Sequence, residues 1–159
     1  METELGKGTL FRLKLPQLID SEHAAGQKVQ AKTTSHGSGL ILLVEDQTPV
    51  RRLAAETLQT HGYEVLVSRD GEEALSLLAD SSSEVDLLLS DVVMPRMDGM
   101  ELCKRFATLR PHVPILLMSG FVDRVFPNAH PEAQGIPFLR KPFTATQLLE
   151  AVAQALQHS

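Results

Sequence analysis

Cysteine is nearly absent from this 159-residue sequence, and long apolar runs are missing as well. The one cysteine, Cys103, rules out an internal disulfide, and its place in an expected helix favours a packed thiol over a nucleophile. No stretch reaches the roughly 18 apolar residues of a membrane helix. The opening Met1-Glu2-Thr3-Glu4 does not resemble a signal peptide. We therefore expect a cytoplasmic location, with no membrane contact by this segment.

Strong positive charge is also missing. The formal net charge is −5, and no basic run is longer than Arg51-Arg52, so binding of nucleic acid by this chain is disfavoured. The sequence has no Gly-rich phosphate cradle of the Walker type, so ATP is not expected to be a direct phosphoryl donor.

From residue 40 onward, short apolar runs alternate with amphipathic segments. This pattern predicts an α/β fold, in which a doubly wound parallel sheet of five strands is covered by helices on both faces. The expected strands are 40–44, 63–67, 85–89, 114–118 and 136–139. The expected helices lie around 50–59, 71–78, 98–109 and 145–156, with a shortened fourth helix between 121 and 134.

The central strand leads to an acid. The run from Val85 to Leu89 scarcely alternates with polar residues, which is typical of a strand buried on both faces. Asp91 follows this run, and Pro95 ends any strand because it cannot donate to a ladder. Asp98 then offers an N-cap for the next helix. Taken alone, Asp91 is as readily interpreted as a capping or turn residue as it is as a functional acid.

Polar residues also end the other strands. In an open parallel sheet, the carboxyl ends of the strands share one edge, where ligands bind. Clustered carboxylates repel one another unless a cation is present, and Mg²⁺ prefers hard oxygen ligands with room for water. A metal and a lysine beside a carboxylate suit an aspartate that accepts a phosphoryl group. The strand-end residues are Glu45, Asp46, Asp91, Ser119 and Lys141.

These motifs resemble the receiver domain of two-component response regulators over residues 39–158. The matching motifs are Glu45-Asp46, Asp91-Val92-Val93-Met94-Pro95, Asp98-Gly99, Met118-Ser119-Gly120 and Phe138-Leu139-Arg140-Lys141-Pro142-Phe143. The resemblance implies a flavodoxin-like sheet of strand order 2-1-3-4-5 and a cis peptide bond between Lys141 and Pro142. It also implies a receiver that catalyses only its own phosphorylation and dephosphorylation.

The same resemblance implies a role for each matching residue. Asp91 would be phosphorylated by the phosphohistidine of a histidine kinase or phosphotransfer protein, and Ser119 and Lys141 would bind the phosphoryl oxygens. Asp46, Asp91 and the backbone carbonyl of Val93 would hold Mg²⁺, with Glu45 acting largely through a bound water. Ser119 and the aromatic Phe138 would form the switch that turns inward on phosphorylation.

The first residues carry a second resemblance. Gly6-Lys7-Gly8-Thr9-Leu10-Phe11, with Leu13, Leu15 and Pro16, is similar to the last glycine box and closing strand of a histidine-kinase ATPase domain. Residues 1–16 would then be a remnant of that domain, and the expected strand over 9–15 would lack a sheet partner. The polar residues 17–38 would form a flexible linker. This implies the C-terminal receiver of a hybrid sensor histidine kinase. The six histidines of the chain are interpreted as solvated, so the donor histidine lies elsewhere.

Two features depart from the family pattern. Pro127 and Pro131 interrupt the fourth helix, which argues against dimerisation through that face and predicts a monomer. Val93 and Phe121, each two residues beyond Asp91 and Ser119, are apolar and cannot orient an attacking water. We therefore expect slow self-dephosphorylation.

Two alternative functions stay open at this point. An acid-nucleophile phosphatase also attacks phosphate with a strand-end aspartate, but it requires a second acid two residues later, where this chain has Val93. A receiver-like binding module without phosphoryl turnover is disfavoured by the intact set of acids, hydroxyl and lysine. A small phosphoryl donor or beryllofluoride with Mg²⁺ distinguishes these classes.

Overall fold

The computed structural model describes residues 2–4, 8–10, 37–80, 84–120 and 136–157. The chain divides into two units, Met1–Lys32 and Thr33–Ser159. In the first, β1 (Glu2–Glu4) pairs antiparallel with β2 (Gly8–Leu10). The expectation that the strand over 9–15 lacks a partner is wrong for its first residues, because β2 includes Thr9 and Leu10 and pairs with β1. The polar sequence of β1 shows no apolar alternation, so only its backbone pairing reveals it.

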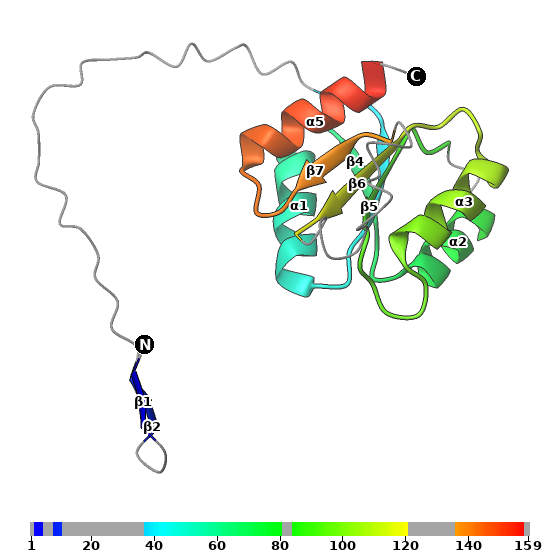
Figure 1. The fold of residues 1–159 in the computed structure, drawn as a ribbon. Coiled ribbons are helices and arrows are strands. Elements are labelled where there is room, and N and C mark those ends of the chain that lie inside the picture. The colour runs from blue at the N-terminus through cyan, green and yellow to red at the C-terminus, as the bar shows by residue number, and fades with distance from the viewer. Residues whose placement is uncertain (1, 5–7, 11–36, 81–83, 121–135, 158–159) are drawn as a thin grey trace, which may run out of the picture. The chain divides into compact units, whose positions relative to one another are not determined.

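The second unit is built on one sheet of five parallel strands (Figure 1). The strand order is β4-β3-β5-β6-β7, which is 2-1-3-4-5 when counted within this unit and confirms the predicted flavodoxin-like fold. The strands are β3 (Leu40–Val44), β4 (Glu64–Ser68), β5 (Leu87–Asp91), β6 (Ile115–Ser119) and β7 (Phe138–Arg140).

Helices cover both faces of this sheet, as predicted (Figure 1). α1 (Thr48–Thr60) and α5 (Ala145–Gln157) lie on one face, and α2 (Gly71–Asp80) and α3 (Gly99–Leu109) lie on the other. Successive strand residues point to opposite faces, so the inner strands must be apolar at every position. No helix among the described residues is long and apolar enough to cross a membrane.

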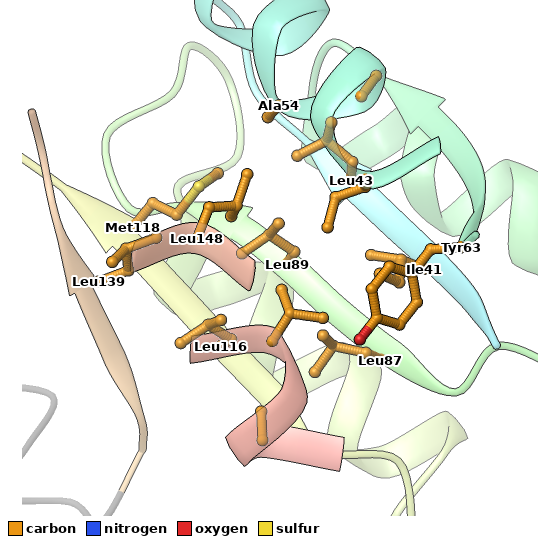
Figure 2. Close-up of a cluster of buried hydrophobic side chains, with 14 residues drawn as sticks. Ile41, Leu43, Ala54, Tyr63, Leu87, Leu89, Leu116, Met118, Leu139 and Leu148 are labelled. Atoms are coloured by element: carbon orange, nitrogen blue, oxygen red, sulfur yellow. The ribbon is translucent and has the colours of Figure 1, made fainter. Parts of the chain in front are cut away.

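Each face of the sheet carries its own core. Under α1 and α5, Figure 2 shows Ile41, Leu43, Leu87 and Leu89 packed together, with Leu148 of α5 against them. Under α2 and α3, the neighbouring strand positions alternate into a second cluster, which includes Leu42, Val44, Leu88, Leu102, Phe106 and Leu117. Most of these side chains are fully buried, and their burial drives folding of the unit.

The central strand lies further along the chain than predicted. β5 spans Leu87–Asp91 instead of 85–89, because its ladder with β6 continues until Asp91 pairs with Met118. The N–H of Val92 then donates to the Met118 carbonyl at 2.9 Å. Asp91 is therefore the last residue of a fully buried strand, with its backbone held by the sheet.

Several local expectations can be compared with the structure. Asp98 caps α3, as predicted, and accepts a hydrogen bond from the Glu101 N–H at 2.8 Å. Cys103 is buried, and its burial raises the pKa of the thiol to about 12, as expected of a packed thiol. The Lys141–Pro142 bond is cis. The fourth-helix prediction, the linker residues 17–36 and Phe121 fall outside the described residues.

Candidate functional site

The strand-end residues meet at one edge of the sheet, as the parallel topology predicts. One pocket is lined by Asp46 after β3, Asp91 at the end of β5, Ser119 at the end of β6 and Lys141 after β7. Glu45 adjoins them through Lys141. The same pocket is also lined by Gln47, Pro49, Val50, Leu53, Val93, Gly120, Pro142 and Phe143.

Three carboxylates cluster at this pocket, two of them in its lining and Glu45 directly behind Lys141. Glu45, Asp46 and Asp91 each offer an oxygen, and these oxygens lie within 4.8 Å of one another. Glu45 is fully buried and Asp91 is 4% exposed. Burial raises the pKa of the Glu45 carboxyl, a hydrogen bond from Lys141 opposes that rise, and the charge on Asp91 adds to it. Like charges held this close in a buried site are mutually destabilising.

Lys141 connects two of these acids. Its ammonium Nζ donates to Oε2 of Glu45 at 2.5 Å and to Oδ2 of Asp91 at 2.8 Å. The side chain is only 15% exposed, so water screens these contacts weakly. One ammonium against three carboxylates still leaves an excess of negative charge inside the pocket.

The donor set is suited to a hard divalent cation. Oδ1 of Asp46 is buried and has no hydrogen-bond partner among the described residues. A buried carboxylate oxygen without a partner is unfavourable unless a cation or water reaches it. Carboxylate oxygens beside an open pocket are the ligands that Mg²⁺ prefers. The side chains present therefore fit the predicted metal.

The remaining predicted residues take different positions. Ser119 is 1% exposed and lines the pocket, and its main-chain carbonyl accepts a hydrogen bond from the Lys141 N–H at 2.9 Å. Val93 also lines the pocket, with a side chain 49% exposed. Phe138 is not among the lining residues; it is half-buried and packs against the core under α2 and α3. The structure thus brings Ser119 to the acids and places Phe138 away from the pocket.

Comparison with known proteins assigns the chain to a family. The sequence profile of the response regulator receiver domain matches residues 41–153. The chain belongs to the response regulator receiver family. It is therefore a receiver domain of two-component signalling, as the sequence motifs implied.

Individual relatives cover this receiver domain to different extents. The chain is 37% identical to the sensor kinase CckA of Brucella abortus over 163 residues, which is 98% of this chain and 17% of that protein. It is 40% identical to the response regulator protein FleR of Pseudomonas aeruginosa over 116 residues, which is 72% of this chain and 24% of FleR. The chain thus spans a quarter or less of the length of these two relatives.

Solved structures agree with the topology. The crystal structure of the receiver domain from the hybrid histidine kinase CckA has a TM-score of 0.64 and 40% identity, covering 75% of this chain and all of that one. The chemotaxis protein CheY4 of Vibrio cholerae has a TM-score of 0.66 and 30% identity, covering 75% of this chain and 99% of CheY4.

Sequence reasoning did not identify the contacts of two arginines with residues that follow strands of this receiver domain. Arg51 of α1 donates to the main-chain carbonyls of Glu45 and Asp46. Arg96, in the loop after β5, forms an ion pair with the buried Asp70 at the start of α2. The spacing of Arg51, five residues after Asp46 in a first helical turn, was an available signal. Arg96 and Asp70 lie 26 residues apart in the sequence, so no local sequence pattern predicts their pairing.

Proposed function

We propose that Asp91 is the phosphoryl acceptor of this receiver domain. The observation that carries the proposal is the convergence of Asp91 with Asp46, Glu45 and Lys141 at one edge of the sheet. A carboxylate oxygen of Asp91 attacks the phosphorus of a phosphohistidine, the P–N bond breaks, and the imidazole leaves with the bonding electron pair. The product is an acyl phosphate on Asp91.

The side chains around Asp91 have separate roles in this transfer. Lys141 donates hydrogen bonds that offset the charge on the phosphoryl oxygens. The Ser119 hydroxyl, at the end of the adjacent strand, binds a phosphoryl oxygen. The displacement of Ser119 is accompanied by an inward turn of Phe138, which changes the signalling surface. In the present structure Phe138 packs on the core under α2 and α3, so this switch requires it to leave that position.

The proposed metal is Mg²⁺. Asp46, Asp91 and the main-chain carbonyl of Val93 would hold it, and Glu45 would act largely through a bound water. The unpartnered Oδ1 of Asp46 supports this assignment. When bound, Mg²⁺ supplies positive charge against the carboxylates and the transferred phosphoryl group.

The proposed partner is a histidine kinase or phosphotransfer protein that presents a phosphohistidine. Apolar residues of the pocket lie beside the acceptor, and Leu53 and Val93 are 60% and 49% exposed. Such exposed apolar side chains favour contact with a protein partner over contact with a small charged donor. We expect the isolated receiver domain to be monomeric.

We also propose that this segment belongs to a cytoplasmic part of a hybrid sensor histidine kinase. The alignment with the sensor kinase CckA covers 98% of this chain and so extends into the residues before the receiver domain. That extent supports residues 1–16 as the closing part of an ATPase domain and residues 17–38 as a linker.

The acceptor proposal is tested by phosphoryl incorporation. The protein is incubated with acetyl phosphate and Mg²⁺, and peptide mass spectrometry locates the added phosphoryl group. We expect incorporation at Asp91 in the wild type and in the control Asp98→Asn, whose acid caps α3, and none in Asp91→Asn. Incorporation in Asp91→Asn would contradict the proposal. Absence of incorporation in the wild type would favour a binding module, and steady release of phosphate without accumulation would favour a phosphatase.

The acyl phosphate is expected to be long-lived. Val93 is apolar and half exposed beside Asp91, so its side chain cannot orient a water for attack on phosphorus. We predict that the phosphorylated domain decays over minutes or longer and that Val93→Asn decays faster. Decay is measured as loss of the Asp91 phosphopeptide after the donor is removed. A wild-type half-life of seconds would contradict this prediction.

A further inference from the structure

The side chain of Arg51 folds back over the turn that joins β3 to α1. Its Nη1 donates to the main-chain oxygen of Glu45 at 2.6 Å and to that of Asp46 at 3.0 Å. Its Nη2 donates to the Thr48 hydroxyl at 3.1 Å. The first two acceptors are the carbonyls of the residues whose carboxylates form the acidic cluster.

The Glu45 carboxylate also supports this turn, because its Oε1 accepts a hydrogen bond from the Gln47 N–H at 3.2 Å. Gln47 precedes α1, and its side chain makes no capping hydrogen bond. The N–H of Glu45 donates to the Ser68 carbonyl at 3.1 Å, which ties Glu45 to β4. Arg51 extends that support to the carbonyls of both acids. Rotation of the main chain at these residues would swing their carboxylates out of the positions that a metal requires.

The contacts of Arg51 argue for positioning and against simple charge neutralisation. Among the described residues, its guanidinium bonds main-chain carbonyls and a hydroxyl but no carboxylate. A positive charge this close to the acids repels a divalent cation, since like charges repel. As a nearby charge Arg51 therefore weakens cation binding, whereas as a support for the turn it strengthens it. The two roles predict opposite results when the side chain is removed.

We propose that Arg51 is a positioning residue, whose hydrogen bonds to the Glu45 and Asp46 carbonyls hold both carboxylates in the geometry that binds the cation. This inference rests on the proposed Mg²⁺-dependent function. Groups that orient metal ligands from behind contribute strongly to affinity even though they do not touch the metal.

The test measures Mg²⁺ binding by calorimetry without any phosphoryl donor. Arg51→Ala is compared with Arg51→Lys and with Arg52→Ala, a control on the same helix whose side chain is 76% exposed and pairs with Glu56. We expect Arg51→Ala to bind Mg²⁺ more weakly, with a dissociation constant about tenfold higher than that of the wild type. Arg51→Lys should be intermediate, because an ammonium lacks the guanidinium fork, and Arg52→Ala should match the wild type.

A second readout separates positioning from damage to the chemistry. With acetyl phosphate as donor, Arg51→Ala should need more Mg²⁺ for half-maximal phosphorylation but should reach the wild-type rate at saturating Mg²⁺. If Arg51→Ala does not fold, as judged by circular dichroism, Arg51→Lys carries the test and should still bind Mg²⁺ more weakly than the wild type.

Each remaining outcome has a definite meaning. Unchanged or tighter Mg²⁺ binding by the folded Arg51 variant would overturn the positioning role while leaving the proposed function intact. Absence of Mg²⁺ binding by the wild type would instead overturn the proposed function on which this inference rests.

Discussion

The apolar interiors of β3 and β5 contribute differently to stability from the acidic edge at which these strands end. Ile41, Leu42, Leu43 and Val44 of β3 are fully buried and apolar, and the next residue, Glu45, is equally buried but carries a carboxyl group. Burial of each large apolar side chain contributes about 1.5–3 kcal/mol. Burial of a carboxylate opposes folding unless it is paired. The fold is thus stabilised along the strands and destabilised at the edge where the proposed chemistry takes place.

Two buried acids on this edge differ in whether their hydrogen-bond partners or their burial has the larger effect on the pKa. Asp70, 3% exposed after β4, accepts a hydrogen bond from the Glu73 N–H, which, together with Arg96, lowers the pKa of its carboxyl. Glu45 has a raised pKa because desolvation outweighs the hydrogen bond from Lys141. Asp70 is supported as a helix cap, whereas Oδ1 of the neighbouring acid Asp46 has no hydrogen-bond partner among the described residues, which is the property that a cation site needs.

The largest effect is expected in the strand interior. Ile41→Ala, at the fully buried second position of β3, should lower the free energy of unfolding by about 2–5 kcal/mol, because it leaves a cavity in a packed core. Unfolding in urea with a chelator present measures this change. The matched variant Ile41→Val should lose only about 0.5–1.5 kcal/mol. A loss below that of Ile41→Val would contradict the stabilising role assigned to the strands.

A smaller effect, dependent on pH, is expected at Asp70. Because its folded pKa lies below the unfolded value, the charged carboxylate contributes stability above its ordinary pKa, and this contribution is lost as pH falls through the lowered value. Asparagine still caps a helix, but its neutral amide accepts weaker hydrogen bonds than the carboxylate, so Asp70→Asn should be less stable than the wild type at neutral pH by about 1 kcal/mol. The gap should close as the solution is acidified. Urea midpoints of both proteins across pH test this, and a gap independent of pH would contradict it.

The smallest effect concerns the backbone of Arg96. Its φ angle is 68°, in the left-handed region that disfavours residues with a Cβ. Arg96→Ala and Arg96→Gly both remove the ion pair with Asp70, but only glycine relieves the backbone strain. The left-handed backbone costs alanine about 1–2 kcal/mol, and the larger entropy loss of glycine offsets about 0.5–1 kcal/mol of that. Arg96→Gly should therefore be more stable than Arg96→Ala by about 0.5 kcal/mol, as measured by urea unfolding. Equal stability of the two variants would contradict a strained backbone at residue 96.

Sequence reasoning reached the fold and the composition of the pocket for one physical reason. Parallel strands covered on both faces must be continuously apolar, so the polar residue that ends each run is conspicuous, and parallel topology carries all of those ends to the same edge. Asp91, Ser119 and Lys141 could be grouped in this way although 50 residues separate Asp91 from Lys141.

Contacts between a side chain and a distant backbone or loop could not be predicted in the same way. Whether Arg51 turns toward the Glu45 carbonyl or toward solvent depends on its rotamer, as does the pairing of Arg96 with Asp70. The half-buried position of Phe138 depends on which core it joins. Strand ends also shifted, because pairing with a neighbour, and not hydrophobicity, sets where β5 ends.

The most direct test of this account is the stability of Asp46→Asn with and without Mg²⁺, measured by thermal and urea unfolding beside the wild type. Without metal, removal of one of the three clustered charges should make Asp46→Asn more stable by about 1 kcal/mol. Mg²⁺ at about a hundred times its dissociation constant should stabilise the wild type by about 2.7 kcal/mol and the variant far less. A variant that is no more stable than the wild type without metal, and that responds equally to Mg²⁺, would contradict the account.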